Sequence, residues 1–205
     1  MARNCVASID LNAIKSNYLY AKSFTPKSSA IAIIKANAYG HGAVKVANHL
    51  KACADCFGVA CIEEALELRA AGITKTPILL LEGVFEEPEL GLVETNKLWM
   101  VVCNSVQLDW VLKSKPKKPF TIFLKIDTGM GRLGFHADES VEIINTLENS
   151  INVGKITLMT HFSSADNQES NFTKNQIEKF NNTIKTNVNA QSLANSAAIM
   201  AWKDS

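Results

Sequence analysis

The sequence predicts an α/β fold of the TIM type, a (β/α)8 barrel that stops before its last strand. Short apolar runs rich in β-branched residues alternate with amphipathic stretches at helical spacing along the whole chain. The runs are apolar on both faces, which is typical of strands in a buried parallel sheet. Chemically active side chains follow several of these runs directly, where barrels place their sites. With 205 residues and no linker or low-complexity segment, we expect one domain, 1–205.

The elements follow one another in a regular order. A short strand at 6–10 and a helix at 11–21 come first. Seven units then repeat, with strands at 29–34, 57–60, 77–81, 98–102, 121–126, 156–160 and 190–193 and helices at 43–52, 62–71, 87–95, 105–113, 138–149, 170–186 and 195–202. Repeated β-then-α units build a parallel sheet with right-handed crossovers. Seven units are one short of a closed barrel, and an open doubly wound sheet is the alternative.

Several element ends have a local cause in the sequence. Gly72 stops the helix at 62–71, because glycine accepts the left-handed conformation that ends helices. A lysine- and proline-rich turn at 115–119 separates the helix at 105–113 from the next strand. Asn195 or Ser196 is a suitable N-cap for the helix that follows.

Composition excludes some classes of partner and favours a reducing compartment. The 21 Lys and Arg residues balance 20 Asp and Glu residues and are interspersed with them, so we expect no nucleic acid and no membrane surface as partner. We see no signal peptide and no apolar stretch long enough to span a bilayer. The five cysteines are an odd, scattered set, which fits a cytoplasmic protein.

One cysteine cluster raises the alternative of a metal site. His49, Cys53, Cys56 and Cys61 lie close together in the sequence and could supply four zinc ligands. Structural zinc sites usually take two spaced pairs of ligands, whereas this stretch holds one. We therefore expect these residues to belong to two helices and a strand, and no bound metal.

Lys35 is the most informative residue. It ends the apolar run 30–34 and is followed by a turn that contains Tyr39, Gly40 and Gly42. A lysine at the carboxyl end of a buried strand lies where barrels build active sites. We expect its apolar surroundings to disfavour the ammonium form, as a Schiff-base lysine requires.

A second motif joins Lys125 and Arg132 through the glycines at 129, 131 and 134. The G-x-G-x-x-G spacing raises the alternative of a dinucleotide site. That fingerprint belongs directly after the first apolar strand, whereas here Lys125 and Asp127 interrupt the strand end. We favour a turn that presents Arg132, whose guanidinium can bind a substrate carboxylate through two hydrogen bonds.

Two further strand ends carry polar groups. His161 follows the strand at 156–160 and could be a base, a metal ligand or a packing partner for a planar cofactor. Asn195 and Ser196 open a helix, whose free N–H groups can bind phosphate. The Tyr39 hydroxyl could hydrogen-bond to the same phosphate, or Tyr39 could be a half-buried aromatic residue with an exposed tip.

Together these segments resemble the alanine racemase family. Residues 34–42 (Ile-Lys-Ala-Asn-Ala-Tyr-Gly-His-Gly) resemble its pyridoxal-phosphate attachment motif, and residues 125–132, 160–162 and 194–198 resemble three more of its motifs in the family's order. The resemblance covers essentially the whole chain. It implies a barrel that carries pyridoxal 5'-phosphate as an aldimine on Lys35.

The resemblance also implies roles for individual residues. Tyr39 and Ser196 would hold the phosphate, and His161 and Asn195 would line the cofactor. Arg132 would contact the cofactor's phenolic oxygen and the substrate carboxylate. Lys125 matches a position that the family often carbamylates, and the carbamate would orient Arg132.

The implied reaction is interconversion of L-alanine and D-alanine by two bases, which supplies D-alanine for peptidoglycan. Lys35 would be the base for the D-alanine face. The other base in the family is a tyrosine from a C-terminal β domain of the partner subunit in a homodimer, and this chain lacks that domain. We therefore expect the chain alone to be a poor racemase. The alternatives are a non-catalytic pyridoxal-phosphate-binding module, or a related amino-acid racemase, decarboxylase or aldolase.

Overall fold

A computed structural model describes residues 5–183, 188 and 190–202 of the chain. Its elements, in order, are α1 (Leu11–Ser23), β1 (Ile31–Ile33), α2 (Lys35–Tyr39), α3 (Ala43–Leu50), β2 (Cys56–Val59), α4 (Ile62–Ala70), β3 (Ile78–Leu80), α5 (Glu89–Thr95), β4 (Trp99–Val102), α6 (Ser105–Lys113), β5 (Phe120–Asp127), β6 (Phe135–His136), the 3-10 turn η1 (Ala137–Glu139), α7 (Ser140–Glu148), β7 (Val153–Met159), α8 (Phe172–Thr183), β8 (Gln191–Ser192) and α9 (Ser196–Ala201).

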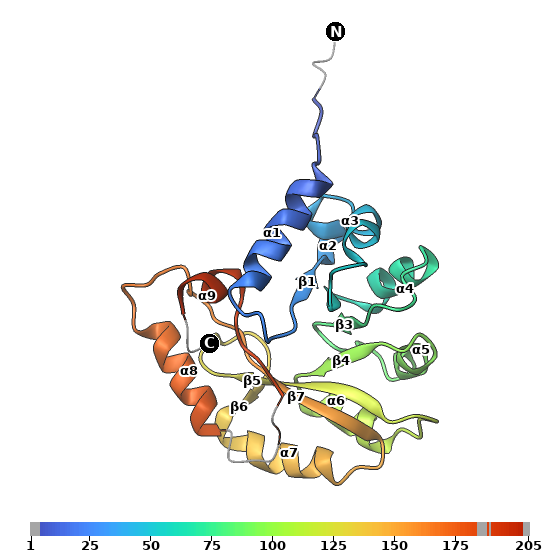
Figure 1. Cartoon of the computed structure of the whole chain (residues 1–205). Coiled ribbons are helices and arrows are strands. Elements are labelled where there is room, and N and C mark those ends of the chain that lie inside the picture. The colour runs from blue at the N-terminus through green and yellow to red at the C-terminus, as the bar shows by residue number, and fades with distance from the viewer. Residues whose placement is uncertain (1–4, 184–187, 189, 203–205) are drawn as a thin grey trace.

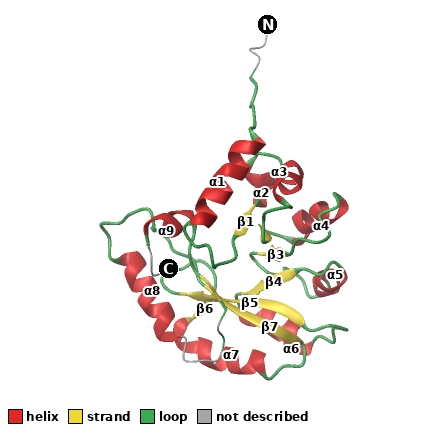
Figure 2. Ribbon diagram, in the orientation of Figure 1, coloured by secondary structure: helices red, strands yellow, loops and turns green. Residues whose placement is uncertain are grey.

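The strands form one curled parallel sheet with helices on its outer side (Figures 1 and 2). Its order is β1-β2-β3-β4-β5-β7-β8, and the two-residue β6 adds to β5. This sequential order confirms the barrel prediction, with seven main strands. The doubly wound alternative is wrong, because such a sheet reverses its strand order at a switch point. Within the described residues β1 and β8 are not paired with each other, so the barrel is open between them.

Alternate residues of the strands pack into two separate apolar clusters. One cluster fills the space between sheet and helices and includes Phe57, Leu80 and Leu124. The other lies on the opposite face of the strands and includes Leu79 and Phe123. The strands are therefore buried on both faces, as their uninterrupted apolar runs predict.

The predicted strand at 6–10 is wrong. Residues 5–10 have no assigned strand or helix, and the side chain of Val6 is 84% exposed. An alternating pattern makes a strand only when a neighbour accepts its backbone hydrogen bonds, and no described strand does so here. Asp10 instead caps α1, since its carboxylate accepts hydrogen bonds from the N–H groups of Asn12 (2.8 Å) and Ala13 (3.1 Å).

Other element boundaries differ by a few residues from the prediction. The predicted helix at 138–149 begins as the 3-10 turn η1 before α7. The predicted helix at 170–186 corresponds to α8, and its predicted last residues, 184–186, lie outside the described residues. Among the described residues, no helix is long and apolar enough to cross a membrane.

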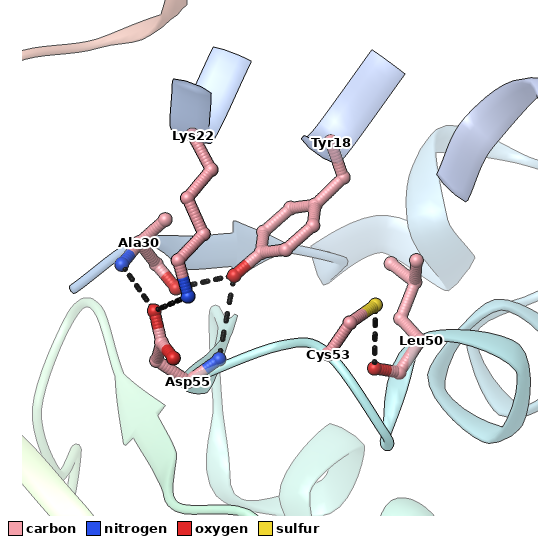
Figure 3. Close-up of polar contacts among 6 residues, drawn as sticks. All are labelled: Tyr18, Lys22, Ala30, Leu50, Cys53 and Asp55. Carbon is pink, nitrogen blue, oxygen red and sulfur yellow. Dashed lines mark hydrogen bonds and ion pairs between the residues drawn. The ribbon is translucent and has the colours of Figure 1, made fainter. Parts of the chain in front are cut away.

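A polar cluster fastens α1 to the start of the sheet (Figure 3). The Tyr18 hydroxyl donates to the Ala30 carbonyl (3.0 Å) and accepts from the N–H of Asp55 (3.3 Å). The Asp55 carboxylate accepts from Lys22 Nζ (2.6 Å) and from the N–H of Ala30 (2.8 Å). Since α1 has no fully buried residue, these bonds add to the packing of its partly buried Leu11, Ile14 and Tyr18 against the core.

The ionisable groups of this cluster shift one another's pKa. The hydrogen bond to Asp55 raises the pKa of Lys22. Burial tends to raise the pKa of Asp55, but the hydrogen bonds from Lys22 and Ala30 outweigh burial and lower it. Both side chains therefore stay charged over a wider pH range than they would apart.

Removing the Tyr18 hydroxyl tests this attachment. We expect Tyr18→Phe to lower the free energy of unfolding by about 1–2 kcal/mol, because the Ala30 carbonyl and the Asp55 N–H lose their partner. Tyr20→Phe is the matched control, since Tyr20 lies on the same helix and is an exposed residue. Urea unfolding of the two variants measures the difference, and equal stability would contradict the assignment.

Candidate active site at the strand ends

The backbone after β1 takes a rare conformation. Ala36, Asn37, Ala38 and Tyr39 have φ values of 50°, 54°, 52° and 53°, in the left-handed region. Such a conformation costs an L-residue roughly 1–2 kcal/mol. The turn begins at Lys35, so the strained segment is also the one that carries the candidate Schiff-base lysine.

Polar side chains hold this left-handed turn in place. The Glu64 carboxylate on α4 accepts from the N–H of Ala36 (2.7 Å) and, with its other oxygen, from the N–H of Ala60 (2.8 Å). It thereby ties the segment after β1 to the segment after β2. Asn37 Oδ1 accepts from the N–H of Ala43 (2.8 Å), which fixes the turn against the start of α3.

The glycine-rich loop after β5 closes around Asp127. Its carboxylate accepts from the N–H groups of Gly129 (2.8 Å) and Gly131 (2.9 Å). Burial tends to raise the pKa of Asp127, but these backbone hydrogen bonds outweigh it and lower the pKa. Gly134, at φ +123°, must stay glycine, because a Cβ there would lie 2.8 Å from the backbone nitrogen of Asp127. The loop thus returns tightly against the end of β5.

Lys125, Arg132 and His161 meet at a small cleft of about 10 Å³, which Thr160 and Met130 also line. Burial, together with the positive charges of Arg132 and Lys35, lowers the pKa of Lys125 to about 8, while Cys103 and Asp127 act in the opposite direction. Arg132 itself is exposed at the turn of its loop.

His161 is held in its neutral form. Burial lowers its pKa to about 4, and the positive charges of Lys125, Arg132 and Lys35 act in the same direction. The three cations near His161 attract anions. The neutral imidazole itself presents a flat, uncharged ring against which a planar group can pack.

Asn195 and Ser196 begin α9, as the sequence predicts. Asn195 Oδ1 accepts from the N–H of Ala198 (3.0 Å), and its Nδ2 donates to the carbonyl of Phe162 (3.4 Å). Asn195 therefore lies beside the segment that follows His161. Tyr39, at 61% exposure, and Ser196 both face solvent, and no described contact joins them.

Comparison with known proteins identifies the family. Residues 9–205 match the family model described as "Alanine racemase, N-terminal domain". The chain belongs to the alanine racemase family. The prediction made from its motifs is confirmed.

Curated and solved members of the alanine racemase family are similar to almost all of the chain. The alanine racemase of Azoarcus sp. (strain BH72) is 46% identical over 202 residues, covering 98% of this chain and 57% of that protein. The biosynthetic alanine racemase of Pseudomonas aeruginosa superposes with a TM-score of 0.92 at 39% identity, covering 96% and 55%. The alanine racemase of Bartonella henselae, solved with covalently bound pyridoxal phosphate, gives 0.84 at 28% identity, covering 96% and 55%. The chain thus spans about half the length of these relatives.

Two alternative sites find no support in this member of the alanine racemase family. Among the residues that the structure describes, no three His, Cys, Asp or Glu side chains gather as metal ligands, so His49, Cys53, Cys56 and Cys61 do not come together as a ligand set. The dinucleotide alternative fails because the loop follows β5, and its N–H groups already bind Asp127 instead of facing outward to a phosphate.

Sequence reasoning missed three residues around the site. Glu64 looks like an ordinary charge on a helix, and its role depends on two contacts with distant segments. Thr128 adjoins the predicted loop but is buried. Gln176 lies on α8 with buried neighbours at helical spacing (Thr173, Ile177 and Phe180), and a polar side chain within such a stripe was the available signal.

The contribution of the Glu64 hydrogen bonds to stability can be measured. We expect Glu64→Ala to lower the free energy of unfolding by about 2 kcal/mol or more, since two backbone N–H groups lose a charged acceptor. Glu67→Ala, an exposed position one turn along α4, is the control for helix propensity and should change little. Urea unfolding is the measurement, and equal effects of the two substitutions would argue against this role.

The buried amine of Lys125 predicts a pH-dependent stability. Its pKa falls from 10.5 to about 8 in the folded chain, so between these values the unfolded chain binds more protons and stability rises with pH. We expect Lys125→Met to be about 1–3 kcal/mol more stable than the parent at pH 7, with the difference shrinking towards pH 10. Unfolding across this range in buffer freed of carbon dioxide, so that Lys125 is a free amine, tests this with the exposed Lys118→Met as control. A difference independent of pH would contradict it.

Proposed function

We propose that the chain is the cofactor-binding part of an enzyme that interconverts L-alanine and D-alanine, with pyridoxal phosphate held on Lys35. The observation that carries this proposal is the placement of Lys35 at the end of β1, on a strained turn and close enough to Lys125 and His161 for its charge to lower the pKa of both. Membership of the family supports it, as does the similarity to the Bartonella henselae alanine racemase with its covalently bound pyridoxal phosphate.

The residues present suit this cofactor. Phosphate and carboxylate groups are anionic, and three cationic side chains act on the cleft without a free acid among them, because Asp127 is occupied by its own loop. When bound, the cofactor supplies an electron sink for the negative charge that forms at the alanine Cα. Lys35 binds the cofactor and holds the proton exchanged on the D-alanine side.

Other residues of the chain bind and orient. In our proposal Tyr39 and Ser196 donate hydrogen bonds to the phosphate from their exposed hydroxyls. His161, kept neutral, and Asn195 line the cofactor. Arg132 binds the alanine carboxylate through its guanidinium and contacts the phenolic oxygen of the cofactor.

Lys125 as an ammonium would repel Arg132 across the cleft. A neutral amine forms a carbamate when its nitrogen adds to the carbon of dissolved carbon dioxide and releases a proton to water. The lowered pKa of Lys125 keeps part of this amine neutral near physiological pH. We infer that Lys125 is carbamylated, which replaces the repulsion by a charge-assisted hydrogen bond that orients Arg132. No metal takes part in this scheme.

The whole reaction requires a second base on the opposite face of alanine. We place it on a further domain of the partner subunit, so the working protein in this proposal is a homodimer. It is cytoplasmic, in agreement with five unpaired cysteines, and supplies D-alanine for peptidoglycan. The alternative is a module that binds the cofactor without turnover.

Cofactor attachment gives the direct test. We expect the chain mixed with pyridoxal phosphate to show the absorbance band of a lysine-bound cofactor, and borohydride reduction followed by peptide mapping to locate the label at Lys35. Lys35→Ala should abolish the band because the attacking amine is gone. The control is Lys155→Ala, because Lys155 is exposed and lies near the beginning of β7, whereas the proposed site lies at the strand ends. A band that persists in Lys35→Ala would overturn the proposal.

A further inference from the structure

Three buried polar side chains lie beneath the loops of the cleft. Thr128 follows β5, Thr160 follows β7, and Gln176 comes from α8, where it is 1% exposed. A polar group this deeply buried is costly unless its hydrogen bonds are made. The hydrogen-bond partners of these three side chains therefore show which parts of the chain they hold in place.

The Gln176 carboxamide uses both of its ends. Its Nε2 donates to Thr128 Oγ1 (3.2 Å) and to the carbonyl oxygen of His161 (3.2 Å), and its Oε1 accepts from the N–H of Ser163 (3.2 Å). Thr128 Oγ1 and Thr160 Oγ1 are 2.8 Å apart and share a hydrogen bond. Both N–H donors are in use, so the orientation of the amide is defined by its partners.

The glycine-rich loop also lies close to α8. A Cβ at Gly129, where φ is +135°, would lie 3.9 Å from Cγ of Gln176 and 3.5 Å from Cζ of Phe172. The loop that carries Arg132 therefore rests on the same face of α8 whose glutamine holds the segment at His161. One side chain thus contacts both loops that line the cleft.

We propose that Gln176 is a positioning residue of the site, which sets the position of His161 relative to the loop that carries Arg132. It makes no contact with the cleft and acts through Thr128 and the His161 backbone. This inference rests on the proposed function for its purpose, and on the contacts above for its geometry. Other bonds keep each loop folded: Asp127 closes the first, and the N–H of Thr160 donates to the Ser192 carbonyl (3.1 Å) at the second.

A second buried glutamine supplies the matched control. Gln107 on α6 is 4% exposed, and its Nε2 donates to the carbonyls of Glu82 (2.8 Å) and Val84 (3.0 Å). Its Oε1 accepts from the N–H of Cys103 (2.9 Å). It fastens the strand ends of β3 and β4, which carry none of the proposed site residues. Gln107→Leu should therefore lose stability as Gln176→Leu does, without moving His161.

The test compares the two leucine variants by two readouts. The imidazole of His161 is titrated by NMR in the chain without cofactor, and pyridoxal-phosphate affinity is measured by absorbance. We expect Gln176→Leu to raise the pKa of His161 by about one unit, because the ring gains water and moves away from the nearby cationic side chains. The same variant should bind the cofactor about tenfold more weakly. Gln107→Leu should leave both readouts at the parent value.

Conservative variants sharpen this result. Thr128→Ser keeps the hydroxyl and should match the parent, whereas Thr128→Val should shift the His161 titration in the direction of Gln176→Leu. The positioning role would be overturned if Gln176→Leu left the His161 titration and the cofactor affinity unchanged. It would also be overturned if Gln107→Leu shifted both by the same amount as Gln176→Leu. If the parent chain does not bind the cofactor, the proposed function fails, and the His161 titration alone decides on Gln176.

Discussion

The parallel register of the sheet is the constraint on which the site depends. Lys125 is paired with Met159 across β5 and β7, and Val102 with Leu124 across β4 and β5. These pairings bring the ends of three strands to one level, so that Cys103, Lys125 and His161 become neighbours. Side chains alternate between the two faces of a strand, so a slip of one residue would turn Lys125 towards the outer helices. The apolar clusters on both faces exclude that slip, because each strand would then exchange its two sets of contacts.

The site stores unfavourable interactions that the surrounding structure must offset. Four successive residues after Lys35 occupy the left-handed region, and like charges face one another at Lys125 and Arg132. The compensation comes from side chains that bind backbone groups: Glu64 at the turn and Asp127 at the glycine-rich loop. Glu64 fixes the turn that follows Lys35, and Asp127 fixes the loop that carries Arg132. Both therefore restrict where the groups proposed to touch the cofactor can lie.

The sequence predicts those features of the fold that are local. Apolar runs give the seven main strands, and Lys35, Lys125, Arg132 and His161 are recognisable because polar residues follow such runs. Register and long-range contacts have no comparable local signal. The Glu64 bonds join segments that are distant in sequence, and the left-handed turn places two alanines where alanine is normally unfavourable. The strand predicted at 6–10 failed for the related reason that a pattern cannot supply its own hydrogen-bonding neighbour.

The attachment of α1 has a dynamic consequence. The side chains by which α1 packs on the core, Leu11, Ile14 and Tyr18, are only partly buried, so the helix belongs to the part of the molecule that opens at low free energy. Its bonds end on Ala30 and Asp55, which immediately precede β1 and β2. A fluctuation of α1 would therefore loosen the first strand at its beginning, while Lys35 stands at its end. The helix α1 and the first residues of β1 would thus share one local opening equilibrium, which amide hydrogen exchange can follow.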